Sequence, residues 1–301
     1  MNVPQFKLNN NVQISCIGNG PAGIGYSPKP HTRNLLIRAY NKLIGHHLLV
    51  NEYVDAVTNS LKIGYTLLDN SASYHNNEAI RLAIKKSGIN RKNLFLTTRI
   101  SNQAQFTHGV RDEFFKELKD LGVEQYDLLQ FHWPVTNCYL DTWHEMVTLY
   151  KQGFVRTIGV ANCHQHHLEA LIEAEGIVPA IDQFEIHPLF TQKPLISFCK
   201  SKGIQVQAYS PIARFDDRLV RLPLLKNIAK KYNKSVVQVI LRWDIQNEII
   251  PIVRSLSKER QLENISIFDF ELTIEEMKAI DSININARVR YDPDNCDFTI
   301  L

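Results

Sequence analysis

The sequence predicts an α/β protein in which all 301 residues (1–301) form one (β/α)8 barrel domain of the TIM type. From about residue 50, short apolar, β-rich runs alternate with helical stretches, as expected when crossover helices join parallel strands. Eight such runs fit into about 250 residues, which is the usual size of this barrel. Eight strand-like runs with intervening helices over this length match a barrel better than an open, doubly wound sheet.

The expected strands are short runs rich in β-branched and aromatic residues. In chain order they are ISCIG (14–18), TLLD (66–69), LFLTT (94–98), DLLQFH (127–132), TIGV (157–160), IDQF (181–184), QVQAY (205–209) and EIIPI (248–252). The stretches between them have helical periodicity, and several end in glycine, a common helix C-cap. Clear examples are residues 77–88, 108–122, 141–153 and 193–203.

Two segments lie outside the repeating pattern. Residues 5–15 (QFKLNNNVQIS) alternate around an Asn-rich turn, which predicts a β-hairpin that plugs the barrel floor. Residues 21–49 form an insertion after the first barrel strand, beginning with the Gly/Pro-rich PAGIGYSPKP. The insertion is either a peripheral decoration or a lid over the barrel mouth, with Tyr26 as a candidate substrate contact.

Composition excludes several classes of protein. The net charge is +3 without a long basic run, so we expect no nucleic-acid or membrane partner. The N-terminus lacks a secretory signal, and we expect a cytoplasmic protein. Five scattered cysteines show no metal-ligand spacing, and His164, His166 and His167 are expected to face water at a helix start. The sequence therefore predicts no metal site.

Four polar residues follow the predicted strands closely enough to share one opening. Asp69 ends one strand and Tyr74 comes shortly after it, while Arg99 and His132 end the next two. Each alone has an ordinary structural explanation, such as a helix cap or a surface ion pair. Because barrel enzymes build their sites at the C-terminal ends of strands, the four together predict an acid-catalysis site.

Ordered segments along nearly the whole chain resemble the aldo-keto reductase family. They are GYTLLDNSASYHNNE, LLQFHWP, VRTIGVANC, PAIDQFEIHP, FCKSKGIQVQAYSP and IPIVRSLSKERQLENISIFDFELTIEEM. The resemblance implies NADPH-dependent reduction of an aldehyde or ketone to an alcohol by hydride transfer. It also implies that Tyr74 is the general acid, that Asp69 organises it and that His132 orients the substrate carbonyl.

Arg99 departs from the family pattern, because it stands where the family has lysine. A phenol with a pKa of about 10 needs a nearby cation to release its proton at neutral pH, and Arg99 keeps that charge. A guanidinium is longer, planar and forked where an ammonium is compact. We therefore expect an active but slower reductase, or one adapted to a substrate that fits the fork.

The resemblance also places the cofactor, which we expect to be NADPH. The implied cofactor-binding residues are Asn162, Gln183, Tyr209, Ser210, Ile212, Arg254, Ser255, Arg260, Glu263 and Asn264. Two arginines in the segment after the last strand favour NADPH over NADH, because a helix start with cations suits a phosphate. Ala161 and Asp182 replace a serine and an asparagine usual in the family, which predicts a weaker nicotinamide cradle.

The substrate is expected to be a small carbonyl compound that contacts His132, Trp133 and Tyr26. Ser101 stands where many family members carry a tryptophan, which predicts a wider pocket. A monomer and a dimer are both compatible with the sequence. One alternative is a catalytically impaired relative that binds NADPH as a binding or regulatory subunit. A barrel isomerase or aldolase is disfavoured, because no Schiff-base lysine or metal cluster is evident.

Overall fold

The computed structural model describes residues 3–21 and 46–301, and these form the predicted barrel. Its parallel strands are β3 (Gly18–Asn19), β4 (Leu67–Asp69), β5 (Phe95–Ile100), β6 (Tyr126–Phe131), β7 (Val155–Ile158), β8 (Val160–Ala161), β9 (Ile181–Glu185), β10 (Gln205–Tyr209) and β11 (Ile250–Val253). Their hydrogen-bonded order is β7-β6-β5-β4-β3-β11-β10-β9-β8. The (β/α)8 prediction is confirmed.

The ring of strands closes through one strand that is interrupted at Gly159. Its first half, β7, pairs with β6, and its second half, β8, pairs with β9. The backbone N–H of Gly159 donates to Leu129 at 2.9 Å, so the ladder continues across the break. A Cβ at this position would lie 2.6 Å from the carbonyl oxygen of Ile181, and only glycine permits so close an approach.

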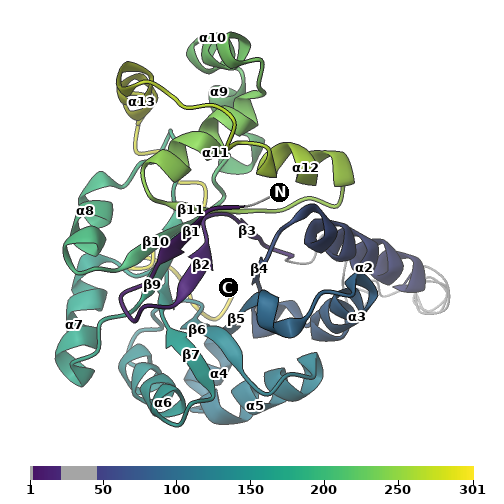
Figure 1. Ribbon diagram of the computed structural model, residues 1–301. Coiled ribbons are helices and arrows are strands. Elements are labelled where there is room, and N and C mark those ends of the chain that lie inside the picture. The colour runs from purple at the N-terminus through teal and green to yellow at the C-terminus, as the bar shows by residue number, and fades with distance from the viewer. Residues whose placement is uncertain (1–2, 22–45) are drawn as a thin grey trace, which may run out of the picture.

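Helices surround the strands on the outside (Figure 1). They are α2 (His46–Ile63), α3 (Asn77–Ser87), α4 (Asn102–Phe106), α5 (Val110–Leu121), α6 (Tyr139–Lys151), α7 (Gln165–Glu175), α8 (Lys193–Ser201), α9 (Asp217–Val220), α10 (Pro223–Tyr232), α11 (Val236–Gln246), α12 (Lys258–Ile265) and α13 (Ile274–Asp281). Gly88 and Gly122 cap α3 and α5 in the left-handed conformation, as their sequences predict. No helix in residues 3–21 and 46–301 is both long and apolar enough to cross a membrane.

The N-terminal hairpin lies across the middle of the barrel in Figure 1, as predicted. Strands β1 (Gln5–Lys7) and β2 (Gln13–Ser15) pair antiparallel. Leu8 and Ile14 are buried among apolar side chains of the barrel strands, and Asn10 donates its side-chain N–H to the carbonyl of Arg156 at 3.1 Å. Burial of these apolar side chains fastens the plug to the barrel.

The N-terminal fifth of the chain differs from the sequence prediction in two places. The predicted strand 14–18 is wrong as one element, because Ile14 and Ser15 belong to the hairpin and the barrel strand begins at Gly18. A Cβ at Gly18 would lie 2.6 Å from Ile252, so β3 crosses too closely for a side chain. Helix α2 begins at His46, inside the segment assigned to the insertion. Residues 22–45, including Tyr26, lie outside the described residues.

Candidate active site

The C-terminal ends of β4, β5 and β6 bring the four predicted catalytic residues together. Asp69 is the last residue of β4, Arg99 lies near the end of β5, and His132 directly follows β6. Tyr74 ends a short 3-10 turn after β4, and its ring meets that of His132 edge-on, with centroids 6.0 Å apart. Residues distant in sequence thus share one opening, where barrel enzymes carry out chemistry.

Arg99 and Asp69 form a buried ion pair beneath this opening. Their side chains are only 2% and 5% exposed. The guanidinium also donates to the carbonyl of Asn70 at 3.0 Å and to Oε1 of Gln183 at 2.7 Å. Burial alone would lower the pKa of Arg99, but the adjacent Asp69 carboxylate outweighs it and the pKa is raised. Arg99 is therefore a permanent cation, locked by three partners.

The half-buried phenol of Tyr74 lies within the field of this cation. Burial raises the pKa of Tyr74, while the charge of Arg99 acts in the opposite direction and lowers it. Arg254 and Arg290 lower the pKa further, and Asp69 raises it. Arg99 is the strongest of the influences that favour the phenolate. The phenol stays protonated at neutral pH, next to a charge that stabilises the anion formed on proton transfer.

His132 is held as a neutral imidazole. Burial, followed by the charges of Arg99 and Arg290, lowers the pKa of His132 to about 3. Its Nδ1 lies 3.3 Å from the hydroxyl of Ser71. A Ser71 hydroxyl that donates to Nδ1 fixes the proton of the neutral ring on Nε2. His132 can then donate a hydrogen bond through Nε2 to a carbonyl oxygen.

Asn162 and Tyr209 face the same opening from the other side of the barrel. The Tyr209 hydroxyl donates to Oδ1 of Asn162 at 2.7 Å, and the amide of Asn162 donates to the carbonyl of His132 at 2.9 Å. Asn162 has a left-handed backbone (φ 63°), which asparagine tolerates better than most residues. This network connects the predicted nicotinamide contacts directly to the predicted catalytic histidine.

Gln183 is more constrained than a free carboxamide ligand would be. Its Oε1 accepts a hydrogen bond from Arg99. Its side-chain N–H groups donate to Asp69 at 3.0 Å and to Gln207 at 2.9 Å. The forked guanidinium of Arg99 thus reaches the residue predicted to bind the nicotinamide. Gln207 was missed at the sequence level, although its place on β10 two residues before Tyr209 could have indicated an inward side chain.

The loop after β10 carries the residues predicted to meet the pyrophosphate. Ser210 has φ 51°, and three consecutive residues, Ala213 to Phe215, also have positive φ values. Such conformations cost about 1–3 kcal/mol each in non-glycine residues and are concentrated at ligand sites. The half-buried Ile212 lies within this strained loop.

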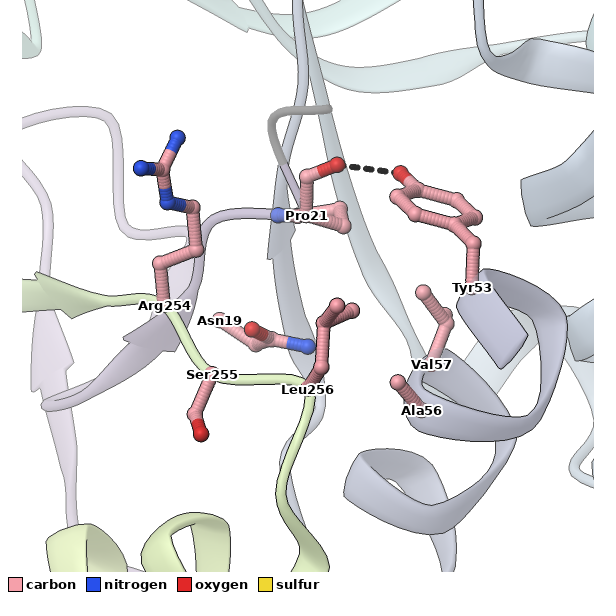
Figure 2. A pocket seen from close by; sticks show the side chains of 8 residues that line it. All are labelled: Asn19, Pro21, Tyr53, Ala56, Val57, Arg254, Ser255 and Leu256. Carbon is pink, nitrogen blue, oxygen red and sulfur yellow. Dashed lines mark hydrogen bonds between the residues drawn. The ribbon is translucent and has the colours of Figure 1, made fainter. Parts of the chain in front are cut away.

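A pocket lies beside the loop that follows β11 (Figure 2). Its lining residues are Asn19, Pro21, Tyr53, Ala56, Val57, Arg254, Ser255 and Leu256. Tyr53 rises from α2 and donates a hydrogen bond to the carbonyl of Pro21 (Figure 2). Arg254 and Ser255, two predicted cofactor residues, line this small pocket.

The remaining predicted cofactor residues lie on α12, directly after this loop. Ser257 caps the helix by accepting from the backbone N–H of Arg260 at 3.3 Å. Arg260 is exposed, Glu263 is half-buried and Asn264 is buried. An exposed guanidinium in the first turn of a helix is well placed for an anion, because the helix start is itself electropositive.

The substrate side of the opening is shaped by the C-terminal segment. Trp133 is buried and packs against Phe298, with ring centroids 6.5 Å apart. Ser101 is the N-cap of α4, and its hydroxyl donates a hydrogen bond to Glu113 at 2.6 Å. Arg290, which sequence reasoning missed, is the third positive charge near Tyr74 and the second near His132. No sequence pattern would have placed it there, because it lies 158 positions after His132.

Asp182 lies away from the cradle that it was expected to weaken. It is fully buried on the opposite face of β9 from Gln183, near the thiols of Cys163 and Cys199. The backbone of Cys163 donates to its carboxyl group and lowers the pKa of Asp182, but burial has the larger effect. Burial raises the pKa of Asp182 well above its ordinary value, so the group is held neutral.

A phenol beside a buried cation can protonate a developing alkoxide, and a neutral imidazole can donate a hydrogen bond to a carbonyl oxygen, so this opening suits the reduction of carbonyl groups. Comparison with known proteins identifies the family. Residues 50–285 match the model of the Aldo/keto reductase family, and the chain belongs to that family. It is therefore a carbonyl-reducing oxidoreductase.

Several curated relatives match over most of their length. The chain is 44% identical to the uncharacterised oxidoreductase YtbE of Bacillus subtilis over 252 residues, which cover 82% of this chain and 89% of the relative. It is 42% identical to the glyoxal reductase of the same organism over 248 residues, with the same coverage. It is 33% identical to the methylglyoxal reductase DkgA of Escherichia coli over 245 residues, covering 81% and 88%.

Solved structures agree with the fold. An aldo-keto reductase from a Medee basin deep-sea metagenome superposes with a TM-score of 0.84 at 33% identity, covering 97% of this chain and 99% of its own. A Bombyx mori aldo-keto reductase in complex with NADP superposes with a TM-score of 0.83 at 31% identity, covering 98% and 97%.

Proposed function

We propose that this protein uses NADPH to reduce small aldehydes and ketones of the glyoxal and methylglyoxal kind, with Tyr74 as the proton donor. One observation carries the proposal. The Arg99 cation, buried and fixed by Asp69, acts on the phenol of Tyr74, whose ring faces the neutral imidazole of His132. The named activities of the glyoxal and methylglyoxal reductases support the substrate class.

The residues divide the chemistry between them. The bound NADPH would supply a hydride to the carbonyl carbon. Nε2 of His132 would donate a hydrogen bond to the carbonyl oxygen and orient it. The hydroxyl of Tyr74 would protonate that oxygen as it becomes an alkoxide, and Arg99 would stabilise the resulting phenolate. Arg99 thus takes the part that lysine has in the family.

We expect NADPH to lie between two sets of residues, one at each of its ends. Asn162 and Gln183 would bind the carboxamide, and Tyr209 would stack on the ring. Ser210 and the backbone near Ile212 would meet the pyrophosphate. At the other end, the pocket beside Arg254 and Ser255 lies next to the start of α12. The residues proposed to hold the adenosine and its 2′-phosphate are Arg254, Ser255, Arg260, Glu263 and Asn264.

A direct test is the consumption of NADPH by the purified protein with glyoxal, methylglyoxal and a bulkier aromatic aldehyde. We expect turnover with all three and the highest kcat/KM for a dicarbonyl compound. Tight NADPH binding without turnover on any carbonyl would overturn the proposal. It would favour the alternative of an impaired, NADPH-binding relative.

A further inference from the structure

Three histidines and one carboxylate meet where the C-terminal segment crosses the start of α7. Nδ1 of His164 lies 2.7 Å from Oδ2 of Asp294, and Nε2 of His166 lies 3.2 Å from Oδ1 of the same carboxylate. The rings of His166 and His167 are in contact at a tilt of 38°, with centroids 3.9 Å apart. The nearest ligand atoms of His164, His166 and Asp294 all lie within 4.8 Å of one another.

Local structure holds these side chains in place from both sides. His164 is the N-cap of α7, and its backbone N–H donates to Nδ1 of His167 at 3.1 Å. On the other side, the backbone N–H of Asp294 donates to the side chain of Asp292 at 3.0 Å, which fixes a turn in the C-terminal segment. The ligand atoms thus converge from two separately ordered pieces of backbone.

We propose that His164, His166 and Asp294 form a zinc site that fastens the C-terminal segment to the start of α7. Two imidazoles and one carboxylate are a donor set that zinc accepts, with a fourth position left for water. The sequence predicts that these histidines only face water, because the carboxylate ligand does not lie near them in the sequence. Asp294 comes from 130 residues away.

The ligand atoms, which lie within 4.8 Å of one another, would have to adopt the spacing of a zinc site. With bonds of about 2.0–2.1 Å, neighbouring ligands of a tetrahedral zinc lie about 3.3 Å apart. His167 supports the site without ligating, because Nδ1 accepts a hydrogen bond and the proton of its neutral ring is therefore on Nε2. That Nε2 lies 3.6 Å from Asp294. Hard cations such as Mg²⁺ prefer oxygen ligands and should not compete.

One neighbouring charge opposes cation binding. The guanidinium of Arg288 lies 3.5 Å from Nε2 of His164. It is also drawn to the ring of Phe190, 4.7 Å away, and to the carboxylate of Asp292 at 3.5 Å. We therefore expect moderate affinity, and Arg288→Gln should strengthen zinc binding.

The site is placed to affect the substrate side of the active site. His164 is two residues after Asn162, and Asp294 is four residues before Phe298, which packs on Trp133. The side chain of Asn102 also donates to the carbonyl of Phe298 at 3.1 Å. A bound zinc would therefore stabilise the segment that borders the substrate, and KM should respond more than kcat.

The test is calorimetric titration of the metal-stripped, tag-free full-length protein with ZnCl₂ at pH 7.5. We expect one zinc per chain, with a Kd on the order of 1–10 μM, and a Tm that rises by a few degrees in saturating zinc. Asp294→Asn and His166→Asn should each weaken binding at least tenfold. Their Tm in EDTA should equal that of the wild type, which shows that both variants fold.

His144→Asn is the matched control. Nδ1 of His144 lies 2.6 Å from Glu175 on the surface, so it is a histidine–carboxylate pair without a second imidazole. This variant should bind zinc like the wild type. Equal zinc affinity in Asp294→Asn, His166→Asn and the wild type would overturn the proposal, as would the absence of binding at 100-fold the expected Kd. Competition by Mg²⁺ at equal concentration would also overturn it.

Discussion

Arg99 is paired with Asp69 inside the barrel, and its forked guanidinium extends from there to Gln183. A single side chain therefore joins the carboxylate that anchors the site to the amide proposed to bind the nicotinamide. The same nitrogen, Nη2, donates to both partners, while Nη1 donates to the carbonyl of Asn70. Arg99 thus places a positive charge beside Tyr74 and contacts the residue proposed to bind the nicotinamide.

Removal of this charge should affect both stability and turnover. Arg99→Met leaves the Asp69 carboxylate buried without its partner, which costs about 3–5 kcal/mol. We expect urea denaturation to show that loss, and kcat to fall at least about tenfold, or 1.4 kcal/mol in barrier height.

Arg99→Lys is the matched control for charge. It should keep most of the stability, and release of Gln183 should lower the KM for NADPH. Turnover in Arg99→Met equal to that of the wild type would show that the cation is not needed by Tyr74.

Arg260 should determine the preference for the phosphorylated cofactor. Arg260→Ala removes an exposed guanidinium from the first turn of α12. Because a charge-assisted hydrogen bond contributes about 1.5–3 kcal/mol, the ratio of kcat/KM for NADPH to that for NADH should fall at least about tenfold. Arg221→Ala, at an exposed site paired with Asp217, should leave the ratio unchanged. An unaltered ratio in Arg260→Ala would place the 2′-phosphate elsewhere.

His132 should not titrate in the working pH range. Burial lowers its pKa to about 3, so the ring is neutral from pH 5 to pH 8. The pH profile of kcat/KM should therefore show no inflection near pH 6.5 that is due to His132. The wild type and His132→Gln should have the same profile shape in that range. If such an inflection were found, His132 would be a proton donor in its charged form, and its hydrogen-bonding role would be wrong.

Asp182 should make stability depend on pH. Burial raises the pKa of Asp182 above its ordinary value of 3.8, so its contribution to stability is complete below that pH and is lost as pH rises toward the folded-state pKa. Asp182→Asn should match the wild type near pH 4 and exceed it by about 1–3 kcal/mol at pH 7.5. Denaturation at several pH values measures this difference, and a constant difference would show that burial does not raise the pKa of Asp182.

Much of the fold could be predicted from the sequence, because each barrel strand and helix carries a local signal. The predicted runs at 94–98 and 127–132 overlap β5 and β6 and differ from them by one or two residues at each end. Gly88 and Gly122 cap helices as expected. The prediction of one strand at 14–18 was wrong. The composition of this run does not show that its first residues pair with the hairpin while Gly18 pairs with barrel strands.

The site was predictable only in part. Asp69, Tyr74 and His132 could be placed because strand ends converge in any parallel barrel. The contact between Arg99 and Gln183 could not, because it depends on the length of one side chain across 84 positions. The meeting of His164 with Asp294 depends likewise on the path of the C-terminal segment.

The most direct test of the account is NADPH consumption with methylglyoxal by the wild type and by Tyr74→Phe. The variant loses only the hydroxyl that donates the proton, so kcat should fall by about 10²–10⁴-fold while NADPH still binds. Turnover in Tyr74→Phe within twofold of the wild type would contradict the central claim that Tyr74 protonates the carbonyl oxygen.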